Sequence, residues 1–228
     1  MTDANKEKVI VGRRAAELIR DKQIVGVGSG TTVSHFIKYL GERIKKEKIS
    51  IKAVPSSFQT YIELLEAHIP ITTLDENPLL DITIDGADEV DKDLNLIKGG
   101  GAALTQEKII GTYTKKLIII VDSSKYVNKL GTFPLPIEVI PMALMPIKKK
   151  LIEWGGTPKT RMGIKKLGPV ITDNGNFIID CNFGIIENPQ ELEKKLNSIP
   201  GIIENGLFID LTDTVLIGQE DKIIEKTK

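Results

Sequence analysis

The chain has 228 residues and a formal net charge of zero, with 31 Lys and Arg against 31 Asp and Glu, and 41% of its residues are hydrophobic. A chain of this length buries roughly 70% of the surface that it exposes when unfolded, enough for one large core or two smaller ones. The charge balance argues against a dedicated nucleic-acid-binding protein, and no apolar run approaches the roughly 20 residues of a membrane span. With one cysteine, Cys181, and no signal-peptide pattern at the N-terminus, we expect a cytoplasmic protein without a disulfide or a multi-cysteine metal site.

The first half of the sequence alternates strand and helix patterns. Apolar residues spaced along one helical face from Val33 to Ile44 predict a helix. Ser56 and Ser57 are suitable caps for another helix, on which Phe58, Ile62 and Leu65 share a face. Strand, helix and strand in succession imply parallel pairing in a layered α/β core. Short runs rich in Ile and Val predict the strands, at 24–27, 51–54, 82–84, 94–97 and 117–121.

From about residue 137 the pattern changes to β-α-β-β-α-β, the order of a ferredoxin-like domain. We expect its strands at 137–140, 157–162, 177–181 and 202–204, and its helices at 146–154 and after Asn188-Pro189. Strand-like runs at 207–209 and 214–217 are expected to return to the first sheet. We therefore predict an α/β protein with a parallel-sheet domain and a smaller α+β domain, at residues 1–134 plus 206–228 and at 135–205.

Polar or glycine-rich segments follow four of the predicted strands, namely GSGTT (28–32), DGADE (85–89), KGGG (98–101) and DSSK (122–125). Ligands of open α/β sheets bind beyond the carboxyl ends of the strands. Four such segments in succession predict a site for a small, polar, anionic molecule.

The segment GSGTT leads directly into the helix predicted from Val33. Glycines let backbone amides approach a ligand, and a helix N-terminus attracts phosphate. The segment lacks the Lys-Ser/Thr pair of a P-loop, and Thr31 occupies the third glycine position of a dinucleotide fingerprint, which argues against NAD. A glycine turn that binds no ligand remains an alternative.

The acidic segment 85–93 fails the EF-hand pattern in both registers, so we expect Asp91 and Asp93 to be solvated turn residues. Asp85 differs from them because it ends an apolar strand. Lys98, at the head of three glycines, is suited to stabilise an oxyanion. The helix beyond it is expected to place Glu107 about two turns from the glycines, where a lone glutamate usually faces solvent.

The remaining chemically active side chains have simpler interpretations. His35 and His68 have no partner at metal-ligand or nucleophile spacing, so we expect both to be structural or exposed. Cys181 lies in an apolar strand and is most simply a small core residue.

Read together, five motifs closely resemble the type A ribose-5-phosphate isomerase family in order and spacing. They are GVGSGTTVSHFI, DGADEVDKDLNLIKGGGAALTQEKII, VDSSKYVNKLG, IEVIPMA and TDNGNFIID. The resemblance implies interconversion of D-ribose 5-phosphate and D-ribulose 5-phosphate, a step of the non-oxidative pentose phosphate pathway, without metal or organic cofactor. It also implies a Rossmann-like catalytic domain, a ferredoxin-like second domain, and a homodimer or homotetramer.

The resemblance further implies roles for individual residues. Glu107 is the proton-shuttling base, with Asp85 and Lys98 as the other catalytic residues. Lys8, with a weaker match, approaches the phosphate. The residues implied in substrate binding are Ser29, Gly30, Thr31, Thr32, Asp85, Gly86, Ala87, Asp88, Lys98, Gly99, Gly100, Gly101, Lys125 and Lys8.

The residue types suit this chemistry, because one carboxylate above a planar cis-enediolate can move a proton between C1 and C2. Two other functions remain open from the sequence. A sugar-phosphate sensor would need a DNA-binding module, and the roughly 20 residues before Ile24 are too few for one. An acyl-CoA transferase would use a glutamate nucleophile, but the lysine–triglycine segment favours the isomerase.

Overall fold

The computed structural model describes residues 3–165 and 167–228, which form two compact units. Unit 1 comprises the described residues up to Ala87 together with Gln106–Tyr126 and Leu211–Lys228. Unit 2 comprises Asp88–Thr105 and Val127–Asp210. The domain ranges expected from the sequence stay a prediction, and residues 1, 2 and 166 within them lie outside the described residues.

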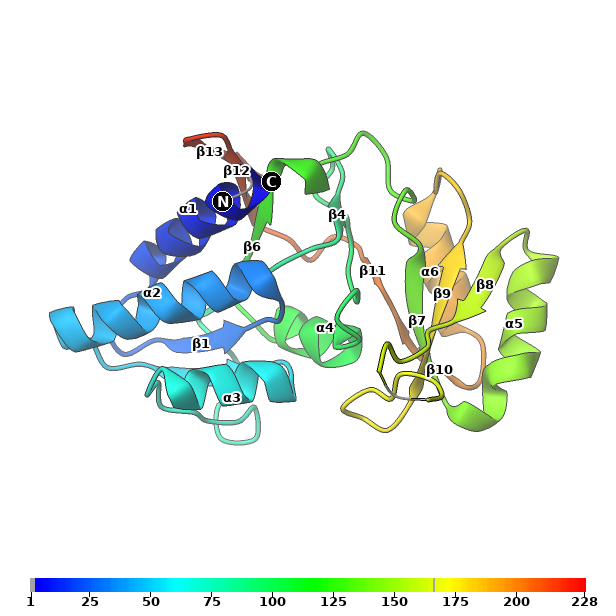
Figure 1. The fold of residues 1–228 in the computed structure, drawn as a ribbon, viewed down its shortest axis with the longest axis horizontal. Coiled ribbons are helices and arrows are strands. Elements are labelled where there is room, and N and C mark those ends of the chain that lie inside the picture. The colour runs from blue at the N-terminus through cyan, green and yellow to red at the C-terminus, as the bar shows by residue number, and fades with distance from the viewer. Residues whose placement is uncertain (1–2, 166) are drawn as a thin grey trace. The chain divides into compact units, whose positions relative to one another are not determined.

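Unit 1 is built on a six-stranded sheet with the order β13-β12-β6-β3-β1-β2. All neighbours from β12 to β2 pair in parallel, and β13 pairs antiparallel to β12 at one edge. The predicted parallel α/β architecture is therefore confirmed (Figure 1). The strands are β1 (Ile24–Val27), β2 (Lys52–Pro55), β3 (Ile82–Asp85), β6 (Leu117–Asp122), β12 (Thr214–Gln219) and β13 (Lys222–Thr227).

Helices pack on both faces of this sheet. Helices α1 (Asp3–Leu18) and α2 (Thr31–Glu47) lie side by side and share a core cluster with Ala53 of β2 (Figure 1). Val54, the next residue of β2, packs instead with Ile110 of α4 (Leu104–Thr112). Because consecutive strand residues point to opposite faces, α4 covers the face opposite α1 and α2.

Several helix expectations can be compared directly with the structure. Helix α3 (Phe58–Glu66) begins directly after Ser57, one of the two predicted caps, whose side chain accepts from the Thr60 amide. Ser56 does not cap the helix but is fully buried. Helix α1 and strand β13 were not expected, because neither segment has a clear apolar period: both are mainly polar, with charged residues between the apolar ones.

Unit 2 contains an antiparallel sheet with the order β10-β7-β9-β8. Its strands are β7 (Leu135–Val139), β8 (Thr157–Thr160), β9 (Phe177–Asn182) and β10 (Ile202–Asn205), and its helices are α5 (Leu144–Glu153) and α6 (Pro189–Asn197). The chain order β7-α5-β8-β9-α6-β10 is the predicted β-α-β-β-α-β arrangement. A short 3₁₀ helix, η2 (Pro141–Ala143), precedes α5, so Pro146 lies in the first turn of that helix.

A three-stranded antiparallel sheet, also in unit 2, corrects two sequence predictions. It has the order β11-β5-β4, with β4 (Glu89–Val90), β5 (Leu96–Ile97) and β11 (Leu207–Phe208). The run at 94–97 therefore does not join the parallel sheet, and the run at 207–209 does not return to it. The expectation for 214–217 is confirmed, because β12 pairs with β6.

No helix among the described residues has both the length and the apolar character that crossing a bilayer requires.

Candidate active site

The sheet of unit 1 places Gly28 and Asp85 side by side at its switch point. Strand β1 lies between β2 and β3, so the chain leaves β1 in one direction and returns on its other side. Ligands of open α/β sheets bind at this point, beyond the carboxyl ends of the strands. A Cβ on Gly28 would lie 1.8 Å from Asp85 Oδ1, so only glycine leaves room for this carboxylate.

The Asp85 carboxylate is 1% exposed and is oriented by backbone amides. Its Oδ1 accepts from the amides of Ser29 at 3.2 Å and Gly86 at 2.7 Å. Ala87, the last residue of unit 1 in this segment, is half-buried. The acid expected at the end of a strand is thus fixed next to the glycine turn that the sequence singled out.

A chain of hydroxyl groups supports the same turn. Ser29 Oγ lies 2.8 Å from Ser56 Oγ and 3.1 Å from Ser57 Oγ. Ser57 Oγ donates to Thr60 Oγ1 at 3.0 Å, and Thr60 Oγ1 donates to the Gly28 carbonyl at 2.6 Å. Ser56 and Ser57, expected from the sequence only as helix caps, thus also support the glycine turn, and two serines directly after a strand were a signal for this cluster.

The turn continues into the N-terminus of α2. Gly30 is the cap residue with φ of 100°, a conformation that favours glycine, and α2 begins at Thr31. The first amides of a helix have no intrahelical acceptor and lie at the positive end of its dipole. Thr32 is buried and Thr31 is exposed.

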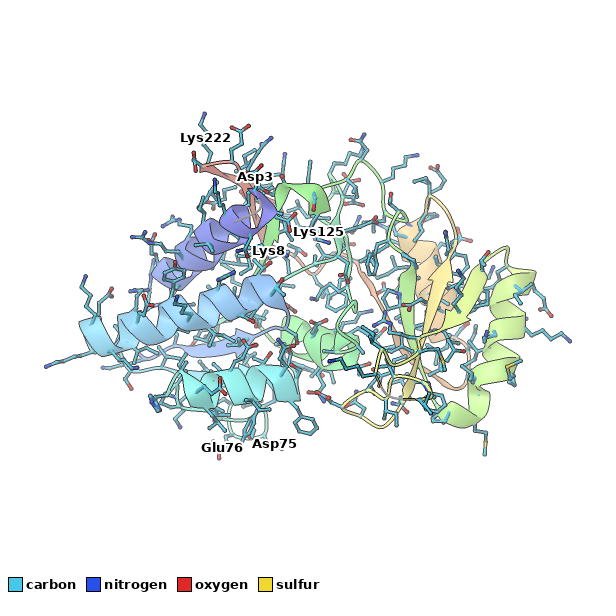
Figure 2. All side chains as sticks on the ribbon, in the orientation of Figure 1. Asp3, Lys8, Asp75, Glu76, Lys125 and Lys222 are labelled. Carbon is cyan, nitrogen blue, oxygen red and sulfur yellow. The ribbon has the colours of Figure 1, made fainter. Side chains whose placement is uncertain are left out.

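Lys8 of α1 reaches this N-terminus, as Figure 2 shows. Its Nζ donates to Thr31 Oγ1 at 3.1 Å and lies 4.0 Å from Asp122 Oδ2. The structure therefore brings Lys8 together with the 29–32 turn. The motif match alone was weak for Lys8 and did not establish this position. Ammonium, hydroxyl and helix amides at one place are suited to bind a phosphate.

Two buried carboxylates, its own Asp122 and Glu7 of α1, hold the DSSK segment in place. Asp122 ends β6 and accepts from the amide of Ser124 at 3.1 Å, which starts the 3₁₀ helix η1 (Ser123–Lys125). Glu7, which is 5% exposed, accepts from the amide of Ser123 at 2.9 Å and from its hydroxyl at 2.8 Å. Lys125, the last residue of η1, is half-buried (Figure 2).

Glu107 lies in the first turn of α4, which begins at Leu104. Its exposure is 5%, so the expectation for a lone helical glutamate, that it faces solvent, is wrong here. A carboxylate in the first turn is stabilised by the helix dipole. A buried carboxylate at the N-terminus of a helix is suited to proton transfer.

The acid-and-glycine segments of unit 2 form a second group. The Gly100 amide donates to Asp88 Oδ2 at 2.7 Å, and the Asp88 amide donates to the Ile97 carbonyl at 2.9 Å. Lys98 is 2% exposed, and its Nζ lies 5.5 Å from the centroid of the Phe208 ring. Gly99 has φ of 104° and is buried, whereas Gly100 and Gly101 are exposed.

Three of the motifs that carried the family resemblance meet at Glu138, which is fully buried in β7. Its Oε1 accepts from Thr172 Oγ1 at 2.8 Å, Asn174 Nδ2 at 3.1 Å and Asn176 Nδ2 at 2.9 Å, and its Oε2 accepts from Thr105 Oγ1 at 2.5 Å. The IEVIP glutamate therefore organises the TDNGN turn, a role that the sequence analysis did not assign.

The other acidic and sulfur groups have structural roles. Asp91 is 6% exposed and accepts from the amides of Asp93 and Asn95, so the expectation that it is solvated is wrong, whereas Asp93 is exposed as expected. Within the described residues, no three His, Cys, Asp or Glu side chains are grouped so that they could hold a metal ion. Cys181 is a core residue as predicted, and burial raises the pKa of its thiol to about 12.

Comparison with known proteins gives consistent matches along the chain. A family model described as ribose 5-phosphate isomerase A (phosphoriboisomerase A) matches residues 52–222. Ribose-5-phosphate isomerase A of Trichodesmium erythraeum is 51% identical over 213 residues, which cover 92% of this chain and 90% of that protein. Its counterpart from Methanothermobacter thermautotrophicus is 47% identical over 214 residues, which cover 94% of each chain.

Solved structures match as closely. A D-ribose-5-phosphate isomerase in complex with phospho-erythronic acid has a TM-score of 0.96 at 45% identity, covering 99% of both chains. Ribose 5-phosphate isomerase A from Methanocaldococcus jannaschii has a TM-score of 0.94 at 44% identity, covering 98% of this chain and 99% of that one.

Proposed function

The chain belongs to the ribose 5-phosphate isomerase A family, and on this premise we propose how its residues carry out the reaction. It is an aldose–ketose isomerase that interconverts D-ribose 5-phosphate and D-ribulose 5-phosphate. The observation that carries this function is the match to ribose-5-phosphate isomerases over more than nine-tenths of the chain. The match favours the isomerase over the sensor and the acyl-CoA transferase.

Glu107 is the base that takes the proton from C2 of the aldose and returns it to C1. The reaction needs one group that acts as base and then as acid on neighbouring carbons, and a carboxylate above a planar cis-enediolate meets that need. The burial of Glu107 and its place in the first turn of α4 support the assignment. A buried site also limits exchange of the abstracted proton with water.

Asp85 is the acid–base group that opens the sugar ring. Ribose 5-phosphate is mainly a closed ring in solution, so a proton must be moved before C1 becomes a carbonyl. The amides of Ser29 and Gly86 hold the Asp85 carboxylate at the strand end, which supports this role. Gly86 and Ala87 extend the same substrate loop.

Lys98 and the glycines after it stabilise the oxygen that becomes negatively charged. A cation with restricted motion in a buried position stabilises a developing oxyanion more than a solvated one does. Lys98 meets this condition, being 2% exposed. Asp88, Gly99, Gly100 and Gly101 bind the sugar hydroxyl groups in this proposal.

The 5-phosphate binds at the N-terminus of α2, to Ser29, Gly30, Thr31 and Thr32 with Lys8. The hydrogen bond from Lys8 to Thr31 supports this assignment because it brings a cation to the helix amides. Lys125 contributes a second cation to substrate binding.

We expect the enzyme to be located in the cytoplasm and to form a homodimer or homotetramer. Light scattering of the purified protein measures the number of subunits.

The test combines an activity assay with the Glu107→Gln substitution. The wild-type protein should convert ribose 5-phosphate to a ketose. Glu107→Gln keeps the size of the side chain but removes its basicity, so turnover should fall by about 10²–10⁴ while binding of a phosphorylated substrate analogue persists.

Glu66→Gln is the matched control, since it makes the same change at an exposed position of α3 and should leave turnover unchanged. Near-wild-type turnover of a folded Glu107→Gln protein would exclude Glu107 as the base. Asp85 would then be the next group to test.

A further inference from the structure

Arg161 connects the triglycine segment to β9 through all three nitrogen atoms of its guanidinium group. Arg161 directly follows β8, and its Nε and Nη2 donate to the two carboxylate oxygens of Asp180 at 2.9 and 2.5 Å. Its Nη1 donates to the carbonyl oxygens of Gly99 at 2.8 Å and Gly100 at 3.0 Å. None of the motifs in the sequence analysis drew attention to this residue.

The backbone around Arg161 is fixed independently of these contacts. Its amide donates to the Ile178 carbonyl at 2.9 Å, and its own carbonyl accepts from the Val170 amide at 2.9 Å. The side chains of Arg161 and Asp180 are 15% and 26% exposed, so solvent screens the pair only in part. The guanidinium is therefore a fixed donor and not a mobile surface group.

These contacts determine the direction of two peptide groups. In a trans peptide the carbonyl and the following amide point in opposite directions. The Gly99 and Gly100 carbonyls point to Arg161, so the amides of Gly100 and Gly101 point away from it. The Gly100 amide donates to Asp88 Oδ2 at 2.7 Å, as this geometry requires.

The segment could not hold this arrangement by its own stiffness. Three consecutive glycines have more backbone freedom than any other tripeptide, and Gly99 has φ of 104°. Leu104 and Pro136 pack against Gly99, where a Cβ would lie 2.8 Å from Leu104 Cδ2. Gly100 and Gly101 are exposed, so Arg161 and Asp88 provide the order that packing does not.

We propose that Arg161, held by Asp180, is a positioning residue that aligns the Gly99 and Gly100 peptide groups and so presents the Gly101 amide to an oxygen of the sugar. This inference rests on the proposed function, in which the lysine–glycine segment stabilises that oxygen. Arg161 does not touch the substrate in this proposal and acts through the two carbonyl groups.

Lysine cannot replace arginine in this role. A guanidinium offers five donors in one plane, which reach a carboxylate and two carbonyls at once, whereas an ammonium is a single point of charge. Arg161→Lys therefore keeps the charge but loses the alignment of at least one peptide group. Misplacement of a positioning group by about 1 Å can lower a rate a hundredfold.

Arg43 provides a matched control within the same chain. Its Nε and Nη2 donate to Glu47 at 3.0 and 2.6 Å, and its Nη1 donates to the carbonyls of Ala16 and Ile19. This is the same pattern of one carboxylate and two carbonyls, at the end of α1 in unit 1, away from every residue assigned to the site. Arg43→Lys should lower stability without changing kcat.

The experiment measures kcat, KM and the thermal midpoint for the wild type, Arg161→Lys and Arg43→Lys. We expect kcat of Arg161→Lys to fall about tenfold to hundredfold with a smaller rise in KM, because the misplaced amide acts mainly on the charged transition state. Arg43→Lys should keep the wild-type kcat, although its thermal midpoint falls by about as much as that of Arg161→Lys.

Wild-type kcat in a folded Arg161→Lys, or equal losses of kcat in both lysine variants, would overturn the inference. If Arg161→Lys does not fold, Asp180→Asn takes its place, with an expected loss of about threefold to tenfold in kcat; unchanged kcat in that variant would also overturn it. An inactive wild-type protein would instead contradict the proposed function, so the two failures are distinguishable.

Discussion

Buried carboxylates illustrate how single residues position this site. An isolated buried charge is strongly unfavourable, so such groups need donors around them. Glu138 has four side-chain donors, and Glu7 has the amides of Ser123 and Glu220 together with the Ser123 hydroxyl. Neither interacts with substrate in the proposed mechanism. Glu138 accepts from Thr105, two residues before Glu107, and Glu7 accepts from Ser123, two residues before Lys125.

The ionisation of Glu7 makes the free energy of unfolding depend on pH. Burial alone would raise the pKa of Glu7, but hydrogen bonds from the Glu220 amide and from the amide and hydroxyl of Ser123 hold that pKa below its ordinary value of 4.5. The ionised form therefore stabilises the fold above pH 4.5, and this contribution is lost as the pH falls through the lowered pKa.

We expect Glu7→Gln to lower the free energy of unfolding by about 1.5–3 kcal/mol at neutral pH, because an amide replaces the charged acceptor. The difference from the wild type should shrink as the pH falls below 4.5. Urea unfolding between pH 3 and pH 7 measures it, with Glu17→Gln, half-exposed on the same helix, as the control. A difference that stays constant over this range would contradict the account.

Among the residue-level expectations from the sequence, the place of Asp85 at the end of a buried strand is confirmed. Gly28 lies beside Asp85 at the switch point, where only glycine leaves room for the Asp85 carboxylate. The expectations failed for Asp91, which was expected in solvent and is buried. For Glu107, helical position alone suggested solvent, whereas the family resemblance implied the catalytic base, and the side chain is buried. Charge alone does not reveal burial, because the amides that stabilise Asp91 come from a turn that has no periodic pattern.

At the scale of elements, the start of α2 joins three separate parts of the chain. Its N-terminus receives the Lys8 side chain from α1, and the turn before it is supported by serines that follow β2. A helix N-terminus and a cation at the same place favour an anion more than either does alone. This element should therefore distinguish phosphorylated from unphosphorylated ligands.

Thr31→Val removes one hydroxyl from this N-terminus at constant size. We expect affinity for a 5-phosphorylated sugar acid to fall about tenfold, while affinity for the unphosphorylated acid stays the same. Competitive inhibition constants for the two compounds measure the effect, and Thr157→Val on the exposed edge strand β8 is the control. Equal losses for both ligands would contradict the phosphate assignment.

Element predictions from the sequence were reliable for the periodic helices and for the parallel strands of unit 1, and poor for the strands of two residues. The pattern from Val33 to Ile44 lies within α2, and the Asn188-Pro189 pair begins α6. Strands β4, β5 and β11 have two residues each, too few to show a period, and the pairing of β5 with β11 joins residues far apart in the chain. The sequence therefore could not indicate that they form a separate sheet.

At the scale of the whole molecule, the change in pattern near residue 137 correctly indicated two kinds of architecture. A parallel sheet and an antiparallel sheet arise from different alternations of strand and helix, which the sequence records. The assignment of 88–105 to the same unit as 127–210 was not apparent from the sequence, because it rests on contacts of β4 and β5.

The overall reaction of the intact enzyme gives a final prediction. If one carboxylate takes the proton from C2 and returns it to C1, C2-deuterated ribose 5-phosphate in ordinary water should yield ribulose 5-phosphate with part of the label at C1. The rest should be lost to solvent, because the protonated base exchanges during the lifetime of the enediolate. Mass spectrometry and NMR of product from early turnover measure both fractions. Complete loss of the label to solvent, even in product from the earliest turnover, would contradict transfer by one shielded carboxylate. The fraction retained also reports how well the buried position of Glu107 excludes water.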